Sequence, residues 1–281
     1  LPSFNGMATK LFKNTLLWNS GVLITPSTEN TMLPAENLRS TSRIKPWRTT
    51  AAGASETLTI DLTSAKSVEL FAFQQGGEYL SQHDSPEAAH NLGTIKIQGN
   101  ASDSWGSPSI SETISTYDQP AMRHNRFTEH VMADNTAYRF WRFIFTKTFF
   151  TPPEIDMKLV FFGGSSSTFP TLDDDGFTIE SEDFSSITTG STGVRFADQR
   201  QSRRSLSLKY SSITNAEKIL FEEWYEMHGT HTPFYVQPDD ATTGAKSLYY
   251  VSFSDAPSFS VNGCDGGGIV WDAQLKLIEE L

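Results

Sequence analysis

Short runs of apolar or alternating residues, separated by polar loops, fill most of the first half of the chain. Runs of four to nine such residues bounded by Gly, Pro, Asn or Ser are typical of β-strands. Because no helical pattern separates these runs, they predict antiparallel sheets packed face to face as a sandwich. The strands expected in this half are 56–62, 67–74, 94–99, 126–133, 137–146 and 157–162.

The expected strand 137–146 carries apolar side chains on both of its faces. Side chains alternate between the two faces of a strand, so this pattern predicts a central strand. The stems of Arg139 and Arg142 would lie against aromatic rings while their guanidinium groups reach outward. Alternatively, these groups could form a cation–π platform for a ligand. One face holds Tyr138, Phe140, Arg142 and Ile144, and the other holds Arg139, Trp141, Phe143 and Phe145.

The second half repeats the strand pattern with one interruption. Thr214 followed three residues later by Glu217 matches a capping box, and Gly229 supplies a stop, so a helix is expected over 214–228. Its apolar residues Ile219, Leu220, Trp224 and Met227 recur at helical spacing and are expected to pack on a sheet. The strands expected around this helix are 177–182, 193–197, 204–210, 232–237, 247–253 and 268–280.

A Gly- and Ser-rich stretch, 163–170, predicts a boundary between two domains. The expected division is an N-terminal arm (1–29), a β-sandwich (30–164), a linker (165–171) and a second β-sandwich-like domain (172–281). The net charge of −11 is concentrated after this boundary, with −1 on residues 1–165 and −10 on residues 166–281. An acidic second half offers no basic stripe for a nucleic-acid backbone, so nucleic acid is not an expected partner.

Composition narrows the class of protein further. Aromatic residues make up 12% of the chain, which favours strands, and no apolar run is long enough for a membrane span. The single cysteine, Cys264, excludes an intrachain disulfide and indicates synthesis in a reducing cytoplasm. The sequence from Met7 resembles a natural start, so residues 1–6 are expected to be an upstream extension.

Sequence signatures of catalysis and metal binding are incomplete. Cys264 lies in a turn-like segment without a neighbouring His, and His228 with His231 would need a further ligand to hold a metal. The segment 171–182 matches the third, fifth, sixth and twelfth places of a calcium loop, but Thr171 stands at the first and Pro170 precludes the entering helix. We therefore expect a solvated acidic turn there, no catalytic residue, no metal and no cofactor.

A series of segments follows in order along the first half: 34–38 with 46–48, then 57–62, 68–73, 95–105, 138–145 and 157–163. Together these segments resemble the galactose-binding-type β-sandwich of discoidin and coagulation-factor C domains. The resemblance covers 30–164 and implies a jelly-roll fold.

Members of that class bind glycans, lipid head groups or proteins through loops at one end of the sandwich, so the resemblance implies a site in 75–90 and 121–126. Arg, His and Asn suit sugar hydroxyls, and aromatic rings stack on sugars. The alternative is that these loops face water or another subunit. The candidate glycan ligands are Tyr79, His83, Arg123, His124, Asn125 and Arg126.

The second half contains, in order, a basic strand within 195–210, the helix, and a Gly-to-Pro-Phe passage into the strand that ends at Gln237. This arrangement is similar to that of minor tail and baseplate (distal tail) proteins of long-tailed bacteriophages. It implies a structural, non-enzymatic component of a phage tail tip in the virion, forming a trimeric or hexameric ring with other tail proteins and contributing to host attachment. Alternatives are a carbohydrate-binding, lectin-like adsorption protein and a glycoside-active enzyme with a sugar-binding domain.

Overall fold

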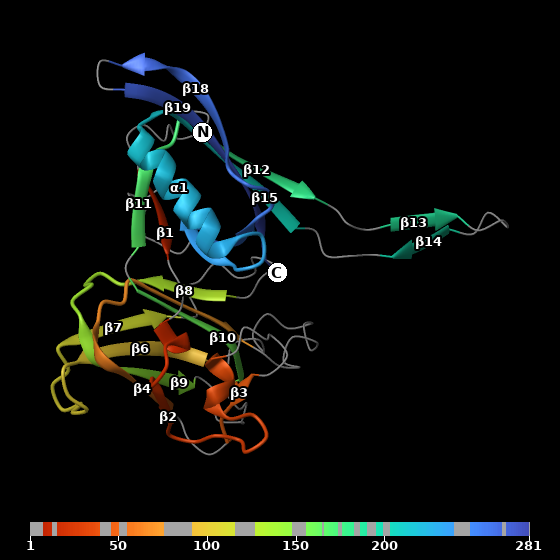
Figure 1. Cartoon of the computed structure of the whole chain (residues 1–281). Coiled ribbons are helices and arrows are strands. Elements are labelled where there is room, and N and C mark those ends of the chain that lie inside the picture. Colours follow the sequence, from red (N-terminus) through yellow and green to blue (C-terminus); the bar gives the residue numbers. More distant parts are fainter. Residues whose placement is uncertain are drawn as a thin grey trace. The chain divides into compact units, whose positions relative to one another are not determined.

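The computed structural model forms two compact units, one of residues Lys13–Ser165 and one of Leu1–Phe12 with Ser166–Leu281 (Figure 1). We call them the sandwich unit and the helix unit. The residues described are 8–12, 16–39, 46–50, 55–75, 92–115, 127–147, 156–164, 166–173, 176–182, 186–189, 195–198, 203–238, 248–265 and 268–280.

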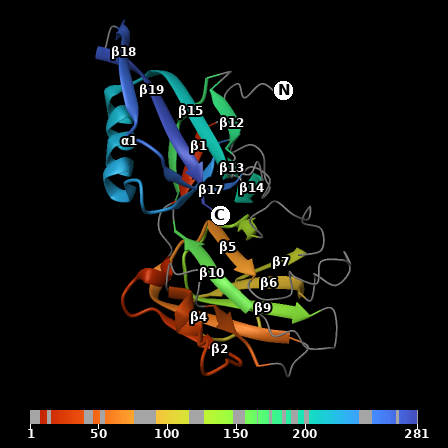
Figure 2. The same ribbon diagram turned by 90° about the vertical axis from the view of Figure 1, so that its right-hand side faces the viewer.

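The sandwich unit is built from two antiparallel sheets (Figures 1 and 2). Two 3₁₀ turns, Leu16–Trp18 and Ala35–Arg39, accompany them. One sheet has the order β2 (Leu23–Pro26), β4 (Ser55–Lys66), β9 (Tyr138–Lys147), β6 (Leu92–Asn100) and β7 (Ile110–Ser115). The other has the order β3 (Trp47–Arg48), β10 (Asp156–Gly163), β5 (Leu70–Gln75) and β8 (Phe127–Val131).

Strand β9 lies at the centre of the five-stranded sheet, between β4 and β6, as the sequence predicts. Trp141, Phe143 and Phe145 are buried on its inner face and pack on rings from the four-stranded sheet. On β6 a side chain at Gly99 would press on the Trp141 indole, because its Cβ would lie 3.2 Å from Cζ3 of that ring. The glycine therefore makes room for one of the two buried tryptophans of this core.

The two sheets are also joined by a polar contact. Glu112 on β7 accepts a hydrogen bond of 2.7 Å from the His130 imidazole on β8, and its carboxylate also accepts one from the backbone amide of Ala133. The contact joins the last strand of one sheet to the last strand of the other. The Glu112–His130 hydrogen bond thus joins the two sheets at their edges.

The helix unit contains an eight-stranded sheet with α1 (Asn215–His228) packed against it. The expected fold class is confirmed, since the chain is mainly β with a jelly-roll sandwich and a second β domain that carries one α-helix in its described part. The strand order is β11 (Ser166–Thr171), β1 (Ala8–Phe12), β16 (Phe234–Gln237), β17 (Tyr249–Phe253), β19 (Gly268–Glu279), β15 (Arg203–Ile213) and β12 (Phe177–Glu182), with β18 (Ser258–Asp265) paired to β19.

Helix α1 begins and ends as its sequence predicts. The Thr214 side chain accepts a hydrogen bond from the amide of Glu217, and the Glu217 carboxylate accepts one from the Thr214 amide, which is a complete capping box. At the other end Gly229 adopts a positive φ of 55° and donates its amide to the carbonyl of Tyr225.

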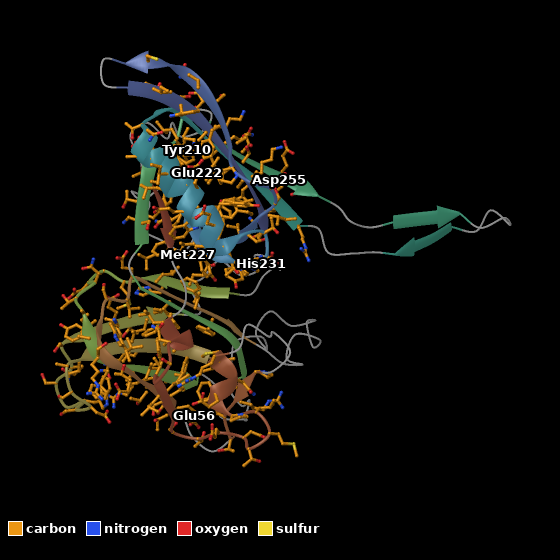
Figure 3. The ribbon with its side chains drawn as sticks, in the orientation of Figure 1. Glu56, Tyr210, Glu222, Met227, His231 and Asp255 are labelled. Carbon is orange, nitrogen blue, oxygen red and sulfur yellow. The ribbon has the colours of Figure 1, made fainter. Side chains whose placement is uncertain are left out.

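The apolar stripe expected to cover the sheet is only partly correct. Phe221, Trp224 and His228 are buried against the sheet, whereas Ile219, Leu220 and Met227 are exposed. Met227 is labelled in Figure 3. The helix carries apolar residues on more than one side, and the spacing alone does not tell which side faces the core.

The domain boundaries differ from those expected. Strand β1 pairs with β11 and β16, so the start of the expected arm is an interior strand of the helix unit, while β2 of the same arm lies in the sandwich. The expected linker is largely β11, which pairs with β1 from Ala8↔Thr171 to Phe12↔Ser166. Pro170 is a weak strand former, but the pairing partner of β11 is supplied by a segment far away in the sequence.

Strands β13 (Ser186–Thr189) and β14 (Arg195–Asp198) pair with each other in a separate two-stranded sheet. The expected strand 193–197 corresponds to β14. No hydrogen-bonded neighbour joins this pair to the eight-stranded sheet within the residues that the structure describes.

Candidate functional site

The six glycan ligands expected from the sequence, in the loops 75–90 and 121–126, all lie outside the described residues. They remain predictions. Within the described part of the sandwich unit, a different set of side chains gathers on the outer face of the five-stranded sheet. We call Gln98, Asn100, Asp103, Trp105 and Arg142 the Trp105 surface.

The strand register brings the centre of this surface together. Gln98 on β6 lies directly opposite Arg142 on β9, and its side-chain oxygen accepts hydrogen bonds of 3.0 and 2.6 Å from the Nε and Nη2 of that arginine. The loop after β6 then returns over the sheet, so that the guanidinium carbon of Arg142 lies 4.5 Å from the centre of the Trp105 ring. The half-buried Trp105 and the buried Gln98 hold the guanidinium between them.

The loop that carries Trp105 is held by its own hydrogen bonds. The Trp105 indole donates to Asp103 at 2.7 Å, and the Asn100 side chain donates to the carbonyl of Ser104 and accepts from the Ser109 hydroxyl. These bonds fix the loop without a ligand. A surface organised in advance loses less conformational entropy when it binds.

Electrostatics favour a charged but partly desolvated arginine. Burial lowers the pKa of the Arg142 guanidinium from its usual value, and the nearby charge of Asp103 acts in the opposite direction. A guanidinium stays protonated in proteins, so Arg142 remains a cation with a donor left after its bonds to Gln98. Such a group can donate to a hydroxyl or an anionic oxygen.

A second arginine lies on the adjoining part of the same sheet. Arg139 forms two hydrogen bonds with the Asp61 carboxylate, at 2.7 and 2.8 Å, and its guanidinium carbon lies 4.7 Å from the centre of the Phe140 ring. The hydrogen bonds from Arg139 are the main reason that the pKa of Asp61 is lowered. Both guanidinium groups therefore lie against aromatic rings, whereas the sequence predicts that the stems lie there and the charged groups reach outward. The guanidinium of Arg142 is covered by a ring from a loop.

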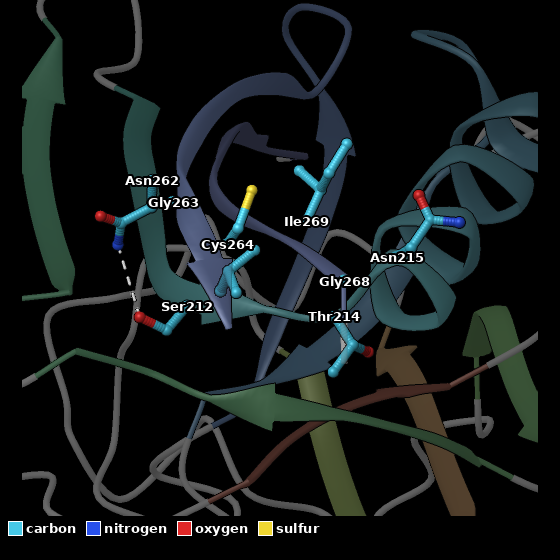
Figure 4. Close-up of a pocket in the computed structure, with 9 residues that line it drawn as sticks. Ser212, Thr214, Asn215, Asn262, Gly263, Cys264, Gly268 and Ile269 are labelled. Carbon is cyan, nitrogen blue, oxygen red and sulfur yellow. Dashed lines mark hydrogen bonds between the residues drawn. The ribbon is translucent and has the colours of Figure 1, made fainter. Parts of the chain in front are cut away.

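The helix unit holds a cavity of about 600 Å³ beside the start of α1 (Figure 4). Polar groups from Ser212, Thr214 and Asn262 line it together with the apolar side chain of Ile269. Asn262 donates to Asp272 at 2.8 Å and to Ser212 at 3.4 Å, so its amide is used within the fold.

Cys264 also lines this cavity, but in a strand rather than the expected turn. It is an exposed free thiol in β18, opposite Ile269 of β19. The Asn-Gly pair before it, which suggests a turn, instead accompanies an irregularity of pairing between Val261 and Gly263.

The remaining candidates for metal binding have structural roles. The His228 ring is buried and stacks on Trp224, with ring centres 4.9 Å apart. Asp173, from the segment that partly matches a calcium loop, accepts hydrogen bonds from the amide and the hydroxyl of Ser211. Gly176 in the same turn has no room for a side chain, because a Cβ there would lie 2.6 Å from the carbonyl oxygen of Lys209. Among the described residues, no group of three or more His, Cys, Asp or Glu side chains could hold a metal ion.

Comparison with known proteins finds neither a matching family model nor a matching curated sequence. Solved structures match. The family 32 carbohydrate-binding module of Clostridium perfringens NanJ, solved in complex with galactose, is 10% identical with a TM-score of 0.39, over 54% of this chain and 97% of the module. The lectin-binding domain of lectinolysin, in complex with Lewis b, is 12% identical with a TM-score of 0.41, over 56% of this chain and 99% of the domain.

A third similar structure has a different role. Reduced XRCC1, bound to the catalytic domain of DNA polymerase β, is 12% identical with a TM-score of 0.37, over 56% of this chain and 99% of its own. The similar structures thus include carbohydrate-binding modules and lectin domains, and also a domain bound to a protein.

No helix among the described residues has the length and apolar character needed to cross a membrane.

Proposed function

We propose that the sandwich unit recognises a carbohydrate on the Trp105 surface. The observation that carries the proposal is the half-buried Trp105 ring held against Arg142, beside side chains that form hydrogen bonds. An aromatic ring provides the apolar plane on which a sugar ring stacks, and neighbouring polar groups pair with its hydroxyls. Carbohydrate-binding modules and a lectin domain are among the structures with a similar sandwich, so the role is one that this fold can take.

The loops 75–90 and 121–126 are the other place where a glycan could bind. Arg123 and Arg126 are the residues chosen to test that site, because guanidinium groups donate hydrogen bonds to sugar hydroxyls. The two locations make different predictions, so one set of variants distinguishes them.

The test is a glycan array followed by calorimetric titration of each glycan that is bound. Trp105→Ala removes the stacking plane and should weaken binding by up to about tenfold, the change that a lost contact of about 1.4 kcal/mol produces. Thr113→Ala, on the exposed face of β7, is the matched control and should bind as the wild type does. Unchanged binding by Trp105→Ala with loss in the double variant Arg123→Ala, Arg126→Ala would move the site to the loops. An array on which no glycan binds would contradict both locations.

A second role, in an oligomeric assembly such as a phage tail tip, is favoured by the pair β13 and β14. An isolated two-stranded sheet is marginally stable in water, so this pair gains stability when another surface covers or extends it. A neighbouring subunit would supply that surface. In this role the chain would form the expected trimeric or hexameric ring, contact other tail proteins and be located in the virion.

The mass of the purified chain in solution tests the assembly role. We expect an oligomer by native mass spectrometry, and a monomer when 186–198 is replaced by a short Gly-Ser linker. A strict monomer at every concentration would count against the homo-oligomeric ring.

A further inference from the structure

Helix α1 presents an apolar stripe to the outside as well as one to the sheet. Ala216, Ile219, Leu220, Glu223 and Met227 follow the spacing of three, four, seven and eleven residues that places side chains on one side of a helix. Ile219 is 43% exposed, Leu220 39% and Met227 47%. We call these five residues with Glu226 the outer face of α1.

This stripe is not the usual solvent-facing side of a surface helix. Such a helix normally turns charged and polar residues to water, and its apolar stripe faces the core. Here the sheet-facing stripe is already complete, because Phe221, Trp224 and His228 are buried. The outer stripe is therefore not needed to close the core of the helix unit, and neighbouring exposed apolar side chains on one surface are typical of interaction sites.

The charge on the outer face is negative and unbalanced. Glu223 and Glu226 are exposed and form no hydrogen bond or ion pair within the described part of the chain. The other two carboxylates of the helix have partners, because Glu217 caps the helix and Glu222 pairs with Lys218.

The helix's lysine does not neutralise that face. Its ammonium group pairs with Glu222 and lies 4.9 Å from the centre of the Phe259 ring and 5.2 Å from that of Trp271. The single basic side chain of α1 other than its histidine is thus directed to the β18–β19 hairpin. The outer face keeps its two free carboxylates beside the apolar stripe.

We propose that the outer face of α1 is a docking surface for a basic amphipathic segment of a partner protein. Apolar residues of the segment would cover Ile219, Leu220 and Met227, and its Lys or Arg side chains would pair with Glu223 and Glu226. Opposite potentials meet in such a contact, which raises the association rate and fixes the orientation. A second copy of the same face would bring four carboxylates together, and an anionic membrane would repel them, so both fit the surface less well.

The probe is a labelled helix-forming peptide of about 15 residues, with Leu at helical spacing and Lys between, and its control is the same composition in an order without periodicity. Fluorescence anisotropy with the whole chain should show binding of the periodic peptide only. Ile219→Lys with Leu220→Ser should weaken it at least about tenfold, or 1.4 kcal/mol. Glu223→Gln with Glu226→Gln should weaken it several-fold and reduce its dependence on salt.

The matched control is Glu180→Gln, which removes an exposed carboxylate on β12, away from α1, and should leave binding unchanged. Thermal unfolding of each variant shows that the fold is retained. Equal binding of both peptides, or no effect of the α1 variants, would overturn the proposal. A concentration-dependent dimer of the chain alone that Ile219→Lys abolishes would also overturn it, because the occupant would then be a second copy.

Discussion

The two units bury a β-sheet in different ways. In the sandwich unit a second sheet covers the first, and Trp141, Phe143 and Phe145 meet rings from the opposite sheet. In the helix unit α1 covers the sheet, with Phe221 and Trp224 in contact with Phe169 of β11. In a sandwich each sheet turns one whole face to the other sheet. A single helix packs only one of its sides on a sheet. A helix that covers a sheet therefore always leaves one side outward, and in α1 that side carries the exposed Ile219, Leu220 and Met227.

The largest expected effect is a loss of the sandwich core. Trp141→Ala removes a side chain that is 0% exposed, and large-to-small changes of this kind cost about 3–5 kcal/mol. Calorimetry of the whole chain should show a much lower melting temperature for one transition and little change in the other. If both transitions moved equally, the two units would unfold together and the comparison would fail.

A comparable effect in the other unit is expected from a residue near the N-terminus. Leu11→Ala should cost about 2–5 kcal/mol because Leu11 is 1% exposed in the core of the helix unit. Leu11→Ala should lower the melting temperature of the helix-unit transition, which Trp141→Ala leaves unchanged. Lys10→Ala on the same strand is the control. If Leu11→Ala shifted the sandwich transition instead, β1 would belong to the sandwich unit, and its assignment to the helix unit would be wrong.

A smaller effect is expected at the start of α1. Thr214→Ala removes the side chain that accepts from the Glu217 amide and should destabilise the helix unit by about 1 kcal/mol. Thr214→Ser keeps the hydroxyl and should restore most of the stability in chemical denaturation. Equal losses in the two variants would show that the cap contributes little.

The smallest effect is expected from the surface ion pair of the sandwich unit. Arg139 lowers the pKa of Asp61 below its unfolded value of about 3.9, so the pair stabilises the folded state above that pH, and the contribution is lost as the pH falls through the folded pKa. Asp61→Asn should therefore lower the melting temperature slightly at pH 7, and the difference from wild type should shrink at pH 3. A difference that grew toward low pH would contradict this assignment.

The sequence predicts the elements better than their partners. The limits of α1 and the central place of β9 follow from local pattern, because capping residues and two apolar faces are visible in the sequence itself. Strand β7 escapes prediction because it has Glu112 at an inward position, which the pairing with His130 explains. Strand β18 escapes it because Asn262 and Gly263 suggest a turn.

The candidate site depends on information that is not local. Gln98 and Arg142 become neighbours through the register of β6 and β9, and Trp105 reaches them only through the path of a loop. A residue pattern shows that arginines and aromatic rings are present, but not which ring lies over which arginine. For the same reason the pattern of α1 does not reveal which of its apolar stripes is covered.

The pairing of Phe12 with Ser166 makes the sandwich an inserted domain. Partner residues in an antiparallel ladder have their Cα atoms about 4.5–5.5 Å apart, so the chain leaves the helix unit and returns to it at nearly the same point. During synthesis, β1 is made first but cannot complete its sheet until the last strands are made, and the whole sandwich can fold in the meantime. An architecture of this kind lets the inserted module be exchanged or lost while the ladder that surrounds it stays in register.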